Sequence, residues 1–523
     1  MGNKKQNTIL YNVEITDIGS EGKSIAKIAW HQSHLTKEEN EKKGKLIIFV
    51  KGGIPGDVAD LEIFRRKKNF AEAKILKIHR FSNLRNKPFC SHFGSCGGCV
   101  WQNLIYEKQL FYKQKQVHEA LEHIGGIDLS SQKENNETLF FPIIPSVNQT
   151  YYRNKLDFAF SNKRWLTQME IQNSEIRMDK PALGFHISGL FDKVLDIEHC
   201  YLQPGLSNEI RLSIKDFALQ NNYSFFDFRK QEGLMRNLII RNSVFGELMV
   251  IVIFGGPVKG IPEVSEKKNN KDPNQLNKWV GFEEGYSEAE GEKIFNLLLF
   301  ISEKFPTITS LMYIFNSKKN DSIFDLNCHL FTGRNFIYEK LDDLLFKISP
   351  KSFFQTNSNQ ALELYKIAFD FAAIKNSDIV YDLYTGTGTI ANFVARQAKK
   401  VIGIETIPQA IEDAKENSRI NQITNTGFFC GDIRDILNDD FIISHGKPEV
   451  IITDPPRAGM EEKVLKKILE ISPQRIVYIS CNPATQARDV AILKSQYKLT
   501  KTQPVDMFPH THHVENVVLL EKR

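Results

Sequence analysis

The stretch "IVYDLYTGTGTIANFVA", residues 379–395, decides the fold of this 523-residue chain. An apolar segment runs into a loop with two glycines, and residues typical of a helix follow. Gly386 and Gly388 let the backbone turn sharply and let a ligand approach it, while the helix behind them offers unpaired N–H groups. The stretch therefore predicts a strand, a ligand-binding loop and a helix in succession.

Similar repeats continue toward the C-terminus. Apolar segments at 400–405 ("KVIGIE"), 449–454 ("EVIITD") and 475–480 ("RIVYIS") are separated by segments of helical composition. Strands that alternate with helices in this way predict a parallel α/β sheet. We therefore expect residues 341–523 to form an α/β domain.

Acidic residues follow several of these strands, at what should be one edge of the sheet. Glu405 is placed to accept both hydroxyls of a ribose, and Asp432 lies where an adenine amino group would be read. Asp454 precedes two prolines that hold its loop rigid, which suits either a loop brace or a reacting group. Asp382 precedes the glycine loop, and no third glycine completes a dinucleotide pattern. These features favour S-adenosylmethionine over NAD.

The segment "IVYISCNPATQARD" (476–489) places Cys481 at the end of another strand. Cys481 is either a small apolar residue that completes a buried strand or a nucleophile presented to a cleft. Glu515, in "DMFPHTHHVENVVLL" (506–520), precedes a further apolar strand. A thiolate that adds to C6 of uracil makes C5 able to take a methyl group, and a base must then remove the C5 proton. Cys481 suits the first role and Glu515 the last.

Four segments, "SCNPATQARD", "DPPRAGM", "DLYTGTGTIA" and "FPHTHHVE", closely resemble the RNA (uracil-5-)-methyltransferase family. The resemblance extends over nearly the whole chain and implies a C-terminal Rossmann-like class I methyltransferase domain. It implies Cys481 as the nucleophile and Glu515 as the base. It also implies contacts around the methyl donor, with Gln355 against the substrate or the donor and Asp454 against the donor or the uracil edge. The six residues are Gln355, Tyr384, Thr389, Glu405, Asp432 and Asp454.

Two positions depart from the family pattern. His512 stands where the family commonly has Gly, and Thr385 stands where it frequently has Cys. Neither change removes a reacting group. His512 leaves the local backbone geometry of its loop open.

Four of the seven cysteines have the spacing of a metal site. Cys90, Cys96 and Cys99 follow a C-x5-C-x2-C pattern, and Cys200 adds a fourth thiol. Such a set suits either a [4Fe–4S] cluster or a structural zinc, and the family resemblance favours the cluster. Two disulfides would conflict with the cytosolic location expected for a chain without a secretory signal.

The N-terminal region reads as short alternating strands between glycine-rich and charged turns, which suits a small β-barrel. Residues 5–79 resemble a TRAM domain, an OB-like barrel that binds RNA, and the basic run at 65–68 suits either a solvated turn or RNA. Residues 80–340 are then a central α+β domain with the four-cysteine cluster. Together with 341–523 they make a multidomain α/β protein.

The expected partner is RNA. Family members with both the barrel and the cysteines typically modify 23S rRNA, so the resemblance implies 5-methyluridine formation there by a cytoplasmic monomer. The alternatives are a tRNA (uracil-5-)-methyltransferase, a 5-methylcytidine enzyme, and an RNA-binding ribosome-assembly factor with vestigial activity. Arg236 and Arg241, with Arg153 and Lys155, are either ordinary strand charges or phosphate contacts. No apolar run is long enough to span a membrane.

Overall fold

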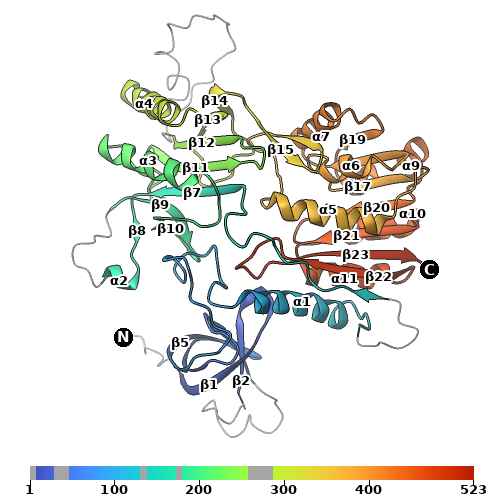
Figure 1. The fold of residues 1–523 in the computed structure, drawn as a ribbon, viewed down its shortest axis with the longest axis horizontal. Coiled ribbons are helices and arrows are strands. Elements are labelled where there is room, and N and C mark those ends of the chain that lie inside the picture. Colours follow the sequence, from blue (N-terminus) through green and yellow to red (C-terminus); the bar gives the residue numbers. More distant parts are fainter. Residues whose placement is uncertain (1–7, 29–45, 130–137, 172–179, 257–286) are drawn as a thin grey trace, which may run out of the picture. The chain divides into compact units, whose positions relative to one another are not determined.

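The computed structural model describes residues 8–28, 46–129, 138–171, 180–256 and 287–523. The chain forms two compact units, shown together in Figure 1. Unit 1 comprises Met1–Gly94, Gly98–Gln149 and Pro455–Arg523, and unit 2 comprises Ser95–Gly97 and Thr150–Asp454. The division of the sequence into 5–79, 80–340 and 341–523 stays a prediction.

Unit 1 begins with a closed five-stranded barrel in the order β1-β2-β3-β5-β4 (blue in Figure 1). Side chains of successive strand residues point to opposite faces, so apolar residues at every second position fill the interior. Ile15, Ala26, Ile48 and Leu61 are fully buried there. The predicted N-terminal barrel is confirmed, with its strands at Ile9–Ile18, Ser24–Ile28, Leu46–Lys51, Val58–Arg66 and Phe70–Arg80.

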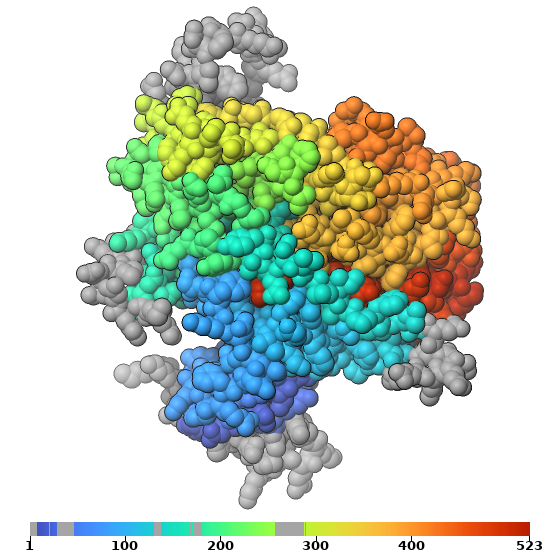
Figure 2. Space-filling model, viewed as in Figure 1, coloured from blue at the N-terminus to red at the C-terminus, as the bar shows by residue number. Residues whose placement is uncertain are grey.

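The rest of unit 1 combines the long helix α1 (Tyr106–His123) with C-terminal strands and helices. Strand β23 (Glu515–Lys522) runs antiparallel to β21 and β22, and its first six residues are buried. Helix α1 packs against α11, and Figure 2 shows small red areas of the C-terminal segment beside the blue and cyan residues of this region. The remaining elements are β6 (Leu139–Phe140), α10 (Glu462–Ile471), β21 (Arg475–Ser480), α11 (Pro483–Leu493) and β22 (Tyr497–Val505).

Unit 2 contains an eight-stranded, mostly antiparallel sheet in the order β14-β13-β12-β11-β7-β9-β10-β8. Helices α3 (Ser207–Gln220) and α4 (Glu288–Lys304) contact each other. A short helix α2 (Gln168–Ile171) and a hairpin of β15 with β16 complete this part. The strands are β7 (Lys155–Ser161), β8 (Arg164–Trp165), β9 (Ala182–Ile187), β10 (Leu190–Asp196), β11 (Met235–Asn242), β12 (Leu248–Gly255), β13 (Ser310–Asn316), β14 (Cys328–Gly333), β15 (Ile337–Leu341) and β16 (Leu344–Ile348).

Two arginines on β11 are buried, whereas a phosphate contact requires an accessible guanidinium. Arg236 is 1% exposed and donates hydrogen bonds to the carbonyl oxygens of Asn316 and Lys318, both at 2.7 Å. Arg241 is also buried and donates to the carbonyl oxygens of Ser349 (3.2 Å) and Ser352 (2.7 Å). A guanidinium that satisfies buried carbonyl groups holds loops in place. The reading of Arg236 and Arg241 as RNA contacts is therefore wrong.

Unit 2 ends with four parallel strands in the order β19-β18-β17-β20, joined by helices. The central residues of β17, β18 and β20 are apolar and buried, as is typical of parallel strands covered on both faces, whereas the edge strand β19 is only partly buried. This confirms the parallel α/β arrangement predicted from the strand–helix repeats. The elements are α5 (Ser358–Ala372), β17 (Ile379–Leu383), α6 (Thr389–Val394), β18 (Lys400–Glu405), α7 (Pro408–Ile420), β19 (Thr426–Cys430), α8 (Ile433–Ile436), α9 (Asp439–His445) and β20 (Val450–Thr453).

Candidate active site

The glycine loop after β17 is a tight turn with an open face. Tyr384, Gly386 and Gly388 have φ of 64°, 54° and 74°, in the left-handed region that glycine adopts at little cost. A side chain at Gly388 would meet the Cβ atom of Ala414 at 2.9 Å, so that glycine is needed for packing. A side chain at Gly386 would meet nothing within 4 Å. The backbone at Gly386 therefore borders open space, in front of the N-terminus of α6 with Thr389.

Two carboxylates hold this loop. Asp382 is fully buried, and its Oδ2 atom accepts hydrogen bonds from the hydroxyl of Thr385 (2.5 Å) and the N–H of Ala391 (3.0 Å). Glu405 accepts from the N–H of Gly386 at 3.2 Å. The hydroxyl of Thr385 thus donates to the loop carboxylate, which gives this departure from the family pattern a structural role. Among the described residues, the buried Oδ1 atom of Asp382 has no hydrogen-bond partner.

Burial controls the charge of these carboxyl groups. Desolvation, reinforced by the nearby negative charges of Asp454 and Glu405, raises the pKa of Asp382 to about 7. Burial likewise raises the pKa of Asp454, which follows β20 and whose N–H faces the carbonyl oxygen of Leu383 at 3.4 Å. Asp432 differs, because it caps α8 and pairs with the guanidinium of Arg434, which lowers its pKa. Unit 2 therefore brings Asp382, Glu405 and Asp454 together around the glycine loop.

Gln355 lies in a loop (349–357) between β16 and α5 that several buried groups fix. The side chain of Asn154 donates to the carbonyl oxygen of Gln355 at 2.9 Å. The carboxylate of Asp413 accepts from the hydroxyls of Ser349 (3.0 Å) and Ser352 (2.5 Å). Arg241 binds two carbonyl groups of the same loop. These contacts hold the backbone around Gln355 in one conformation.

Helix α7 connects the Gln355 loop with the glycine loop. Asp413 and Asn417 lie one turn apart on its buried face. While Asp413 holds the Gln355 loop, the side-chain amide of Asn417 donates to the carbonyl oxygen of Thr387 at 3.0 Å. Sequence reasoning missed this pair. Its only signal was two polar residues at helical spacing in a segment otherwise rich in exposed charge.

In unit 1, Cys481 follows β21 and is half-buried. Asn482 caps α11 by accepting from the N–H of Ala484 at 3.1 Å, which ends the strand directly after the thiol. Strand β23 pairs with β21 in a register that joins Arg475 to Glu521 and Ser480 to Asn516. Cys481 lies one residue beyond β21, and Glu515 is the first residue of β23. Opposed residues of an antiparallel pair point to the same face, so a continuation of this register by one position would set the thiol and the carboxylate on one face, and their meeting stays a prediction.

The residues after Cys481 brace the loop that begins at Pro455. The side chains of Asn482 and Thr485 both donate to the carbonyl oxygen of Arg457, at 3.1 and 3.2 Å. Asp489 is fully buried and accepts from the N–H of Met460 at 2.8 Å. The "SCNPATQARD" motif therefore combines the thiol with the polar groups that fix the neighbouring loop.

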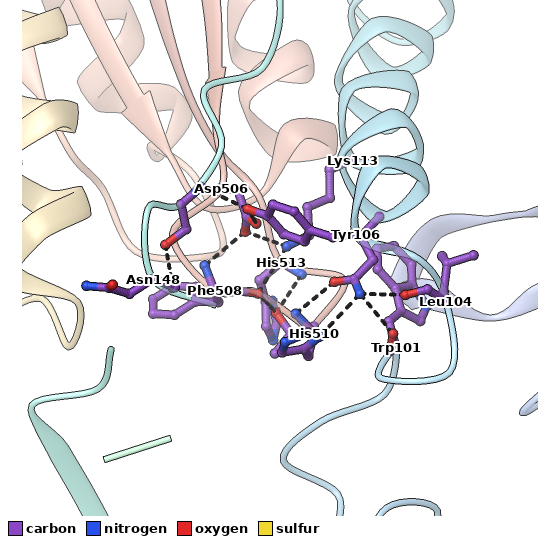
Figure 3. A network of polar contacts seen from close by, with 12 residues as sticks. Trp101, Leu104, Tyr106, Lys113, Asn148, Asp506, Phe508, His510 and His513 are labelled. Carbon is purple, nitrogen blue, oxygen red and sulfur yellow. Dashed lines mark hydrogen bonds and ion pairs between the residues drawn. The ribbon is translucent and has the colours of Figure 1, made fainter. Parts of the chain in front are cut away.

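A buried network fixes the segment 506–513, which leads to Glu515 (Figure 3). Lys113 of α1 donates to the carboxylate of Asp506 at 2.6 Å, and both side chains are inaccessible to solvent. The hydroxyl of Tyr106 donates to the other oxygen of Asp506 at 2.7 Å. Gln109 accepts from the N–H of His510 at 2.9 Å. Burial, with the charge of Lys113, lowers the pKa of His510 to about 4, so this imidazole is neutral at pH 7. Sequence reasoning missed this network, because its partners lie far apart in the chain.

The four cysteines with metal-like spacing do not form a recognisable metal centre. Within the described ranges, no group of three or more His, Cys, Asp or Glu side chains lies in a geometry that could hold a metal ion. All seven cysteines, each within those ranges, are thiols rather than disulfide partners. The structure does not support the predicted [4Fe–4S] cluster.

Two family descriptions match the sequence. Residues 327–523 match tRNA (Uracil-5-)-methyltransferase, and residues 8–76 match the TRAM domain. The second match covers the barrel strands β1 to β4 and most of β5, and the first covers Gln355, the glycine loop, Cys481 and Glu515. No helix in the described part of the chain is both long and apolar enough to cross a bilayer.

Similar proteins span the whole chain. One named as an uncharacterized RNA methyltransferase from Bacteroides thetaiotaomicron is 51% identical, over 97% of this chain and 100% of that protein. Another with that name, from Porphyromonas gingivalis, is 47% identical over 97% and 99%. The solved structure of Pyrococcus abyssi tRNA (uracil-54, C5)-methyltransferase in complex with S-adenosyl-L-homocysteine has a TM-score of 0.64 and 26% identity, covering 98% of this chain and 100% of that one. The chain therefore belongs to the RNA (uracil-5-)-methyltransferase family.

Proposed function

We propose that the protein methylates C5 of a uridine in 23S rRNA through a covalent adduct between Cys481 and C6 of the base. It is an S-adenosylmethionine-dependent RNA methyltransferase of the uracil-5 family. The observation that supports the covalent mechanism is the register of β21 and β23, whose last pair, Ser480 with Asn516, directly adjoins Cys481 and Glu515. A thiol and a carboxylate on one face are the pair that this reaction needs.

Each residue has a separate chemical task. The thiolate of Cys481 forms a bond to C6, and the electron pair of the C5–C6 double bond becomes available at C5. When bound, S-adenosylmethionine supplies an electrophilic methyl group, and C5 forms the new carbon–carbon bond. The carboxylate of Glu515 then takes the proton from C5, the double bond reforms, and the sulfur of Cys481 leaves. Glu515 is 4% exposed, which keeps water away from this base.

The residues around the glycine loop suit the methyl donor. The open space at Gly386, the unpartnered Oδ1 atom of Asp382 and the carboxylate of Glu405 offer room, a hydrogen-bond acceptor and a negative charge for a cationic nucleoside. We propose that the donor is held by six residues, whose individual contacts rest on the family resemblance: Gln355, Tyr384, Thr389, Glu405, Asp432 and Asp454.

The choice of 23S rRNA rests on the resemblance to relatives that have both a barrel and a cysteine set. Transfer RNA is the second candidate, because the Pyrococcus abyssi relative acts on tRNA and matches nearly the full length of this chain. Methylation of 23S rRNA and tRNA transcripts under the same conditions separates the two. Product in tRNA alone would refute the first choice.

A [4Fe–4S] cluster at Cys90, Cys96, Cys99 and Cys200 remains a proposal that rests on spacing and resemblance alone. No step of the reaction above passes through it. Anaerobic purification should yield about four iron atoms per chain with a visible absorption band. Protein with full activity and no iron would refute the cluster.

The covalent mechanism is tested with two variants of the full-length protein. C481A should abolish methyl transfer while leaving RNA binding largely intact, because only the nucleophile is lost. E515Q should accumulate a covalent RNA–protein adduct, because the C5 proton cannot leave and the sulfur cannot be expelled. A denaturing gel of E515Q without a band of reduced mobility would contradict the mechanism.

A further inference from the structure

The turn between β1 and β2 packs against the loop that leads to Glu515. Gly22 closes this turn with φ of 71°. A Cβ atom at Gly22 would lie 2.7 Å from the Cβ atom of His512 and 3.3 Å from the indole nitrogen of Trp101. That indole N–H donates to the carbonyl oxygen of Gly22 at 3.2 Å. The barrel and His512 both belong to unit 1. Because Gly22 has no side chain, His512 can occupy the space that a Cβ atom at residue 22 would need.

The segment around Trp101 makes further contacts with the loop that leads to Glu515. The N–H groups of Val100 and Trp101 both donate to the carbonyl oxygen of His510, at 2.9 and 3.0 Å. Trp101 also packs with the barrel residues Ile18 and Ile54 in a buried apolar cluster. The segment around Trp101 therefore contacts the barrel and the active-site loop at once. Displacement of the barrel turn is transmitted to this loop through atoms in van der Waals contact.

We propose that the β1–β2 turn of the barrel is a positioning element for the active-site loop, because Gly22 sets the position of His512 and thereby that of Glu515. The barrel then does more than bind RNA. The contact between the barrel turn and His512 helps to fix the position of Glu515. This inference rests on the proposed role of Glu515 as the base, and it assigns a use to His512, one of the two residues at which the chain departs from the family pattern.

The test compares two glycines of the barrel that differ only in their surroundings. Gly22 and Gly52 both have positive φ, at 71° and 77°, so alanine strains the backbone similarly at each. A side chain at Gly52 meets nothing within 4 Å, whereas one at Gly22 collides with His512. G22A and G52A are therefore a matched pair that separates the contact from the backbone strain.

The experiment measures kcat and RNA affinity for the full-length wild type, G22A, G52A, H512G and the double variant G22A/H512G. We expect G22A to lower kcat by about tenfold or more relative to G52A, with RNA affinity within about twofold of that variant. H512G removes the Cβ atom that collides. In its background, G22A should therefore reduce kcat no further than G52A reduces it in the wild type.

Three results have definite meanings. Equal kcat for G22A and G52A would overturn the inference. An equal loss from G22A with and without H512G would overturn it as well, because the loss would not depend on His512. A wild type that forms product while E515Q yields no adduct would contradict the proposed base instead, which is a separate failure.

Discussion

Replacing Lys113 by Met should destabilise unit 1 by about 3–5 kcal/mol. The ammonium of Lys113 and the carboxylate of Asp506 are 2.6 Å apart, and neither side chain is accessible to solvent. Met fills a similar volume but leaves the charge of Asp506 buried without its counter-ion. That penalty is a large fraction of the roughly 5–15 kcal/mol that stabilises a typical domain.

Lys115 provides the matched control on the same helix. Its ammonium pairs with Asp17, but these two side chains are 28% and 27% exposed. Solvent screens such a pair, so K115M should cost only about 0–1 kcal/mol. A second variant, K113M/D506N, removes both charges while Asn still accepts from Tyr106. It should recover much of the stability that K113M loses.

The assay is hydrogen exchange of α1 and of residues 506–513, measured along a urea series. K113M should expose both segments at lower urea than wild type, K115M should not, and the double variant should lie between them. The kcat of K113M should also fall, because Asp506 begins the loop that leads to Glu515. If K113M and K115M unfold at the same urea concentration, the buried ion pair does not stabilise the loop and the reasoning fails.

Two further predictions concern unit 2. The folded state holds the proton of Asp382 with a pKa of about 7, well above the unfolded value of 3.8, so this stabilisation is complete in acid and is lost as pH rises toward 7. D382N should remove that part of the pH dependence of the urea midpoint, and S-adenosylmethionine affinity in the wild type should increase across the same range as the carboxylate ionises. D413N should raise the KM for the donor and lower kcat, because the buried Asp413 holds the Gln355 loop. The same change at exposed Glu412, E412Q, should leave both constants unchanged, and equal kinetics for the two variants would refute the role of Asp413.

The sequence was sufficient where local pattern determines structure. Alternation predicts the barrel, and the strand–loop–helix pattern around Gly386 predicts the parallel strands. The sequence also places Cys481 and Glu515 at the edges of apolar strands, as the structure does, while their catalytic roles stay a prediction. In these cases the pattern that predicts the structure lies within a few neighbouring residues of the sequence.

The contacts that were missed join distant segments. Arg236 reads as a strand charge, yet its acceptors are carbonyl groups about 80 residues further along the chain. Lys113 and Asp506 are separated by 393 residues. Any lysine or arginine looks solvent-exposed in a sequence, because burial depends on which backbone oxygens and carboxylates the fold brings to it. Spacing similarly suggested a metal centre at the cysteines that the folded arrangement does not support.

The register of β23 has a consequence for how this enzyme can evolve. If a one-residue deletion between Asp506 and Glu515 made β23 slip by one position against β21, the strand would stay apolar but the carboxylate of Glu515 would turn to the other face of the sheet. The apolar residues of β23 can be replaced by other apolar residues. A change in the length of the segment before β23 is less tolerated, because it can move Glu515. Homologous sequences should therefore vary in residue identity in this segment more readily than in its length.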